Sequence, residues 1–596
     1  MSLPERTAIP ERYRFDLAEI YETPDDWTAA SEAFRQSVTA LQERAEEPLD
    51  SAEDLRALLE DTESLHERKQ RLELYATLSR NIATDDEAAT DRLRRFRDLE
   101  SAFQTAVDAV RYTLVSTGGE SLTEFVDSLE TFRHYAEDFR RQSRYALDPT
   151  LAETVAAYDA ATETPNEVVV AVINEDFEPG PIERPDGESV ELTAGNVRSE
   201  LSHPDRTYRR RVYRRYRESL DRFEASLTEA YAGKIDRAVA DAEVRGYDSV
   251  RDRALQRRSY PESGLRCSLS EAVHDTMLDA TRSNLEPYHR ALALREDRLG
   301  VETLRPWDRD VSIADAEPPT IEYEAARGYI LEALEPLGAS YVDGVEALFD
   351  QRRIDVYPSA GKRGDIPAYC PSSAVDGPFI LANFREDIRT TFYLCHELGH
   401  AMHVETHREG PTRYGTCPRP VSEVPSILHE LLLAERFLEL GGGFAAAARN
   451  RLLECLGGNL YESAMSAAFE HRMVTAVEDG QSVTPERARR AWAELQAEFE
   501  APVAFDDRAG RNWLPPSPRE LYSNYQYVLG AAGALAVRNR LREGDLSPAT
   551  YREVLATTGE QSSLESFQQL GCDVSNEAVY ERAATTFDGY VDRLAT

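Results

Sequence analysis

The stretch His396-Glu397-Leu398-Gly399-His400 is the most informative part of this sequence. Residues four apart on an α-helix lie on one face, so on a helix both imidazoles would project together. At this spacing two ring nitrogens can bind one tetrahedral zinc ion at roughly 2.0–2.1 Å. Glu397 follows the first histidine, and its carboxylate would lie near the open position of the metal, where it can accept a proton from water. The stretch therefore offers two metal ligands and a general base.

Chance is a poor explanation for this pattern. The chain has 596 residues, of which 11 are His and 108 are Asp or Glu. In such a composition a His-acid-x-x-His string is expected roughly 0.04 times. A zinc site of this kind also needs a helix around the motif and a third ligand beyond it.

The surrounding sequence predicts that helix between Asp387 and Thr406. Apolar residues recur there at helical spacing and would face a core: Phe392, Cys395, Leu398, Gly399 and Met402. His403 and His407 continue the histidine stripe. We interpret them as side chains that support the ligands or are hydrated, and Cys395 as a small buried thiol.

A second helix is predicted to supply the third ligand. Ser422 can cap its start, Pro425 would fall in its first turn, and Gly441-Gly442-Gly443 would end it. Glu423 and Glu430 are seven residues apart and therefore share one face. We expect Glu423 to complete a His₂Glu set and Glu430 to orient a histidine. The alternative for Glu423 is a hydrated acid at a helix N-terminus.

These residues and their flanks resemble a known family. With the segments 355–357, 361–364, 379–384 and 422–426, the motif resembles the M3 metallopeptidases, specifically their oligoendopeptidase F branch. In that family the first glutamate of the second helix, here Glu423, is the zinc ligand. The resemblance implies a mainly α, elongated, multi-helix zincin-like fold with a deep central channel and small β regions beside the active-site helix. It also implies one Zn²⁺ per chain and cleavage of short peptides.

One segment departs from the family pattern. The family carries a histidine followed by several tyrosines near the C-terminus, and here Ser517 stands in the place of that histidine. Tyr525 and Tyr527 match the tyrosines. We predict that a phenol, first Tyr527 and second Tyr525, donates to the developing oxyanion, a contact worth roughly 3–4 kcal/mol elsewhere. The alternative for each tyrosine is aromatic packing on a helix.

The charge balance is strongly acidic. Acids outnumber bases 108 to 69, the formal net charge is −39, and lysine occurs only at positions 69, 234 and 362. Such self-repulsion destabilises a compact fold in dilute buffer, whereas molar salt shortens the Debye length to about 3 Å. The sequence thus predicts a halophilic protein from a salt-rich cytoplasm. An ordinary acidic enzyme from a high-GC genome would explain arginine in place of lysine but not the acid excess.

The remaining composition argues against nucleic acid, membrane and export. Arg206–Arg217 holds seven arginines among tyrosines, but in so acidic a chain we interpret it as a helix face that pairs with carboxylates. There is no apolar stretch of eighteen residues, and the first residues lack the features of a signal peptide. The six cysteines have no repeating spacing, as in proteins of a reducing compartment. We therefore expect a cytoplasmic protein.

Two parts are expected along the chain. Residues 1–195 are predicted to form an N-terminal helical lobe, with helices at 55–82 and 91–113. A terminal β-hairpin would pair Val168–Ile173 with Val190–Leu192. Residues 196–596 would form the zinc peptidase catalytic domain.

Within the catalytic domain a strand region at 354–384 precedes the motif. Its part Phe379–Phe384 is either an edge strand that pairs with substrate or a purely structural strand.

The sequence therefore predicts a zinc-dependent metalloendopeptidase that acts on oligopeptides in the cytoplasm. An exopeptidase that releases dipeptides from the C-terminus could use the same site. A peptide-binding protein with an impaired site is the alternative from another class, because Ser517 replaces a histidine. Oligomeric state is left open, with a monomer as one option.

Overall fold

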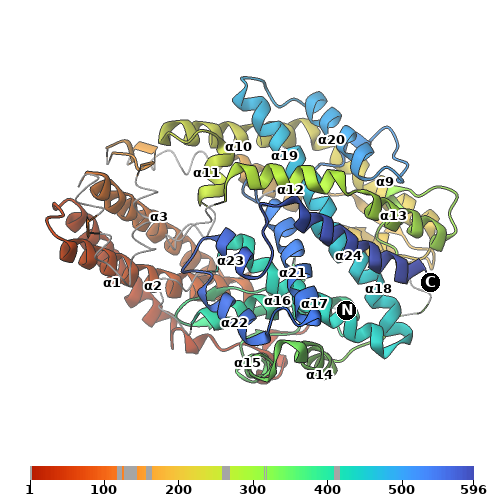
Figure 1. Cartoon of the computed structure of the whole chain (residues 1–596), viewed down its shortest axis with the longest axis horizontal. Helices are drawn as coiled ribbons and strands as arrows, with labels where there is room; N and C mark the ends of the chain where they lie inside the picture. The colour runs from red at the N-terminus through yellow and green to blue at the C-terminus, as the bar shows by residue number, and fades with distance from the viewer. Residues whose placement is uncertain are drawn as a thin grey trace.

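Helices form most of the chain, as expected from the sequence (Figure 1). The computed structural model describes residues 3–116, 124–125, 144–148, 150–152, 154–155, 164–257, 269–313, 316, 318–364, 366–408, 417–517 and 519–595. The strands in this part are short and few, so the predicted class, mainly α with small β regions, is confirmed.

Three long helices form the N-terminal part: α1 Pro24–Ala45, α2 Ala52–Ile82 and α3 Glu87–Ser116. They include both helices predicted for this region. Thr23 begins α1 through a capping box with Asp26, and the Ser51 side chain accepts from the Asp54 N–H at the start of α2. Their apolar faces, together with Phe379 and Leu381, form a hydrophobic core of their own. In Figure 1 these helices lie together at the left.

The predicted hairpin is present only in part. Strands β1 Gly180–Glu183 and β2 Ser189–Leu192 pair antiparallel, but Val168–Ile173 is helical. It belongs to α7 Thr164–Ala171 and to a π-helical turn at Val172–Asp176. Val169 and Val172, three residues apart, are buried in the main core, so packing of a helical face overrides the β preference of these branched residues.

The middle of the chain adds further helices. They are α8 Val197–Leu201, α9 Arg206–Leu220, α10 Glu224–Arg245, α11 Val250–Arg257, α12 Glu271–Ser283, α13 Glu286–Leu299, α14 Tyr323–Leu334 and α15 Ala339–Asp350. The arginine-rich run forms α9, where Arg206 and Arg209 both pair with the buried Asp308. Its interpretation as a helix face that pairs with carboxylates is confirmed.

Two small sheets precede the motif. Strands β3 Ile354–Asp355, β7 Ile380–Ala382 and β4 Ala368–Tyr369 pair in that order, and β5 Ser372–Ser373 pairs with β6 Gly377–Pro378. Because β7 is paired on both sides, the first of the two alternatives for Phe379–Phe384, an edge strand that pairs with substrate, is wrong, and the second, a structural strand, is right. The edge strands of this sheet are β3 and β4.

The C-terminal half packs around two central helices, α16 Ile388–His407 and α17 Arg419–Leu440 (Figure 1). Around them lie α18 Gly442–Leu456, α19 Ser463–Glu478, α20 Pro485–Phe499, α21 Tyr525–Glu543, α22 Pro548–Thr557, α23 Ser563–Gln569 and α24 Glu577–Ala595. The second, larger core runs from Val169 to Leu594. The division at residue 195 stays a prediction. In the described part, no helix has the length and apolar character needed to cross a membrane.

Candidate metal and catalytic site

Helix α16 carries the motif as predicted. Asp387 begins it, because its side chain accepts from the Thr390 N–H at 2.7 Å. Cys395 and Leu398 face the core, and the Cys395 thiol donates to the His429 carbonyl, so its interpretation as a buried thiol is confirmed. His396 and His400 lie on the other side, each with 21% of its side chain exposed.

Helix α17 begins earlier than predicted. Its first residue is Arg419, so Ser422 is not the cap but lies inside the helix, where its hydroxyl donates to the Arg419 carbonyl. Pro425 is accordingly beyond the first turn. The start is set by Pro418 and Pro420, since proline tolerates the first positions of a helix, where an N–H has no partner. The helix ends at Gly441, as predicted, with a φ of 75°.

The two helices bring three predicted residues together. The Oε2 atom of Glu423 lies 3.6 Å from Nε2 of His396 and 3.6 Å from Nε2 of His400. The three donor atoms all lie within 4.8 Å of one another. Ligand atoms around a tetrahedral zinc ion are about 3.3–3.5 Å apart, so this set fits a His₂Glu metal site after a small contraction.

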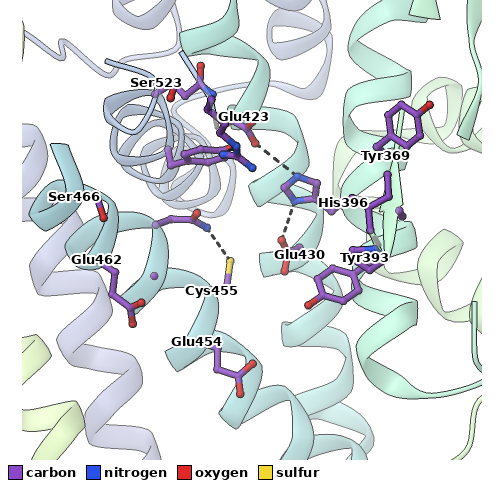
Figure 2. A pocket seen from close by; sticks show the side chains of 18 of the residues that line it. Tyr369, Tyr393, His396, Glu423, Glu430, Glu454, Cys455, Glu462, Ser466 and Ser523 are labelled. Carbon is purple, nitrogen blue, oxygen red and sulfur yellow. Dashed lines mark hydrogen bonds and ion pairs between the residues drawn. The ribbon is translucent and has the colours of Figure 1, made fainter. Parts of the chain in front are cut away.

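Two charged side chains, Glu430 and Arg451, support His396 on the side of its ring that faces away from Glu423. The Nδ1 atom of His396 lies 2.8 Å from Oε1 of Glu430, and the Arg451 guanidinium donates to Oε2 at 2.6 and 2.9 Å. Figure 2 shows His396 between Glu423 and Glu430. Burial opposes ionisation of Glu430, but Arg451 and His396 outweigh it and lower the pKa of Glu430 to about 2. Arg451 lies on α18 and was not found from the sequence, which gives no signal for this pairing.

Glu397 lies beside these groups on the wall of a cavity. Burial raises the pKa of Glu397 to about 7, with His396 acting against the shift and Glu423 adding to it. A carboxylate with a pKa near neutrality is suited to accept and return a proton.

Two glycines allow the helices to approach closely. A Cβ atom on Gly399 would lie 2.5 Å from Cα of Ser426 on α17. A Cβ atom on Gly530 of α21 would lie 2.4 Å from Cβ of Glu423. Helices α16 and α21 therefore both pack closely against α17, through Gly399 and Gly530. The position of Glu423 depends on these two contacts.

The cavity has a volume of about 1600 Å³ and extends between the N-terminal helices and the rest of the chain. Its walls come from α2, the segment 366–374, helices α16 to α18 and the segment 512–527. Seven arginines and eight carboxylates line it, so its charge is nearly balanced in a chain whose net charge is −39.

The two predicted oxyanion donors differ in position. Tyr527 lines the cavity, and the Arg519 guanidinium donates to its hydroxyl. Tyr525 is 1% exposed and packs edge-on against the His274 ring. Ser517 is exposed in a loop, where its carbonyl accepts from Lys234. Arg519 is a cation at the cavity that sequence reasoning missed.

His403 and His407 are not hydrated, contrary to one of the two interpretations. Each is 1% exposed, and Nε2 of each ring bonds the hydroxyl of Thr558, just after α22. Helix α22 packs against α16 and covers this turn, which the local sequence does not reveal.

A comparison with known families decides the membership of this chain. The sequence profile of "Peptidase family M3" matches residues 200–586, which is more than half of the chain. The chain belongs to peptidase family M3.

Individual relatives of this M3 chain match it along nearly its whole length. It is 24% identical to "Oligopeptidase PepF" of Bacillus subtilis, with 99% of this chain and 88% of the relative covered. It is also 24% identical to "Oligoendopeptidase F homolog" of Lactococcus lactis, with 99% and 98% covered. The expected class of enzyme, a metalloendopeptidase of family M3, is confirmed.

Solved structures agree in fold. A putative peptidase from Chlamydophila abortus superposes with a TM-score of 0.84 at 21% identity, over 100% of both chains. Oligoendopeptidase-F from Enterococcus faecium superposes with a TM-score of 0.72 at 21% identity, over 97% of this chain and 98% of the other. The M3 fold expected from the resemblance is therefore confirmed.

Proposed function

We propose that this M3 peptidase is a zinc-dependent endopeptidase that hydrolyses internal bonds of short oligopeptides. His396, His400 and Glu423 would hold one Zn²⁺, and Glu397 would be the general base. The observation that carries the proposal is the placement of one Glu423 oxygen at 3.6 Å from both imidazole nitrogens. When bound, zinc would supply a Lewis acid that polarises the attacking water and the scissile carbonyl.

The groups around the metal position have distinct tasks. Glu397, with a pKa of about 7, accepts a proton from the attacking water and passes it to the leaving amine. Glu430 accepts the Nδ1–H of His396, which leaves Nε2 of that ring directed toward the metal position. Arg451 keeps Glu430 ionised and in place.

Tyr527 is our candidate for the oxyanion donor. Arg519 donates to its phenol oxygen, so the phenol's own proton is available to a substrate carbonyl in the cavity. Burial raises the pKa of Tyr527, which keeps this proton in place at neutral pH. Removing one such donor elsewhere costs about 10²–10³ in kcat.

The cavity supports a short, extended substrate. At about 1600 Å³ it is larger than a typical small-molecule pocket yet far too small for a folded domain. The segment 366–374, which contains strand β4 at the sheet edge, lines it, so a peptide could pair with that edge. The nearly balanced charge suits peptides of either sign. The names of the relatives, oligopeptidase and oligoendopeptidase, point to the same substrates.

We also propose a reducing, salt-rich cytoplasm as the setting. The five cysteines in the described part are free thiols, and the net charge of −39 is suited to high salt. All the proposed catalytic groups come from one chain, so a monomer would suffice.

Glu397→Gln tests the mechanism. The metal-loaded variant should keep one zinc ion per chain at this site, while kcat on a peptide library falls by about 10²–10⁴. Glu405→Gln, on the same helix but away from the cavity wall, is the matched control and should cleave at the original rate. Wild-type turnover in Glu397→Gln would refute the assignment of the base.

The same digest separates the alternatives. Mass spectrometry of the products should show internal cleavage that a chelator abolishes. Release of C-terminal dipeptides alone would indicate an exopeptidase, and peptide binding without any cleavage would indicate a binding protein.

A further inference from the structure

We propose a second metal site, formed by His403, His407 and Cys417, that binds a thiophilic divalent cation such as Zn²⁺. One donor atom from each of these residues lies within 4.8 Å of the other two. The site is separate from the His396–His400–Glu423 set, contains no carboxylate and goes beyond the proposed peptidase activity.

Its ligands come from two elements that meet beside the cavity. His403 and His407 lie one turn apart on α16, with ring centroids 5.0 Å apart. Cys417 directly precedes Pro418, the residue before α17. All three are buried, at 1%, 1% and 8% exposure. His403 and Cys417 nevertheless line the cavity, which gives an ion and a water ligand a route to them.

The hydroxyl of Thr558 orients the rings of His403 and His407 through hydrogen bonds. This hydroxyl donates to the Leu555 carbonyl at 3.1 Å, so its oxygen can only accept from the rings. Nε2 of His403 lies 2.9 Å from that oxygen, and Nε2 of His407 also bonds it. The neutral His403 ring therefore carries its proton on Nε2, and its Nδ1 has a lone pair for a metal. Metal-binding histidines typically donate their other N–H to such a partner.

His403 shows the consequence of this arrangement. Its Nδ1 atom is buried and has no hydrogen-bond partner among the described residues. A buried acceptor without a partner is costly, and a metal would satisfy it. Burial also lowers the pKa of His403, so the ring is neutral, which is the metal-binding form.

The three donor groups of this second site determine which metal ions it would prefer. Two imidazoles and a thiolate favour Zn²⁺ and similar borderline or soft cations over Mg²⁺ and Ca²⁺. Zinc would draw the donors together to about 3.3–3.8 Å. Binding forms a metal–sulfur bond and releases the Cys417 proton to water. The bound ion would tie the end of α16 to the start of α17, the two helices that carry the proposed catalytic ligands.

Cobalt titration of the metal-free full chain tests the site. Because the catalytic set contains no sulfur, a thiolate-to-cobalt charge-transfer band in the near ultraviolet reports only on Cys417. We expect binding of two equivalents of Co²⁺ and the band with one of them. Cys417→Ser should lose the band and one equivalent, yet retain peptide cleavage. Cys370→Ser removes another thiol of the same cavity and should retain both equivalents.

A second measurement uses the original chain, so its result does not depend on whether the Cys417→Ser variant folds. With two equivalents of Zn²⁺, alkylation of Cys417 should be at least tenfold slower than with one, while Cys370 should react at the same rate in both. Saturation at one equivalent without a charge-transfer band would overturn the site, and so would a band that survives in Cys417→Ser.

Discussion

Replacing Gly399 by alanine should disturb the metal site through the backbone. The added Cβ would lie 2.5 Å from Cα and 2.6 Å from N of Ser426, and 2.7 Å from C of Pro425. All three contacts are main-chain atoms of α17, so no side chain can rotate away. An ordinary carbon–carbon contact is about 3.5 Å, and α17 would therefore have to move by about 1 Å.

That displacement acts directly on the proposed ligands. Glu423 lies three residues before Ser426 on α17, and its oxygen is 3.6 Å from the imidazoles of α16. A 1 Å separation would widen this distance to about 4.5 Å, whereas zinc needs about 3.3 Å between ligand atoms. We expect kcat/KM to fall about 10²-fold, the usual effect of a 1 Å misplacement, and metal affinity to fall about 10–100-fold.

Stability is the less informative measurement for this variant. Overpacking costs about 1–3 kcal/mol, but alanine in place of glycine in a helix regains about 1 kcal/mol. The decisive assays are zinc competition with a chromogenic chelator and peptide cleavage at saturating zinc. Gly589→Ala on α24 is the matched control, because nothing lies within 4 Å of the added Cβ. Unchanged zinc affinity and turnover in Gly399→Ala would refute the reasoning.

Three further outcomes are expected. Tyr527→Phe should lower kcat about 10²-fold with little change in KM, whereas Tyr525→Phe should leave kcat within a few-fold; steady-state kinetics compares them. Arg451→Met should destabilise the fold by about 3 kcal/mol, because Glu430 stays buried without its cation. The pKa of Glu430 is about 2, below its ordinary 4.5, so its stabilising effect is complete above pH 4.5 and is lost on acidification toward pH 2. Arg451→Met raises this pKa, and circular dichroism should show acid unfolding at a higher pH than in the original chain. Dialysis from molar to low salt should reduce helicity and cleavage together, and unchanged circular dichroism would contradict the halophilic assignment.

The sequence alone was sufficient where the signal is local. Helix α16 follows from apolar residues at helical spacing, and the four-residue step between His396 and His400 places both rings on one face. The helical class, the family and the prediction of Glu423 also needed no coordinates, because the motif and its flanks lie between residues 355 and 426. The β preference of branched residues misled at Val168–Ile173, where packing decides between helix and strand.

The tertiary structure decided what depends on residues far apart in the chain. Arg451 reaches Glu430 from another helix, and Arg519 donates to the hydroxyl of Tyr527, whereas Tyr525 is buried. Thr558 lies 155 residues from His403, yet it sets the tautomer of that ring and turns an apparently hydrated histidine into a buried one. Such pairings arise from the packing of whole helices. Spacing along the chain encodes the face of one helix, but it does not encode which distant side chain will meet that face.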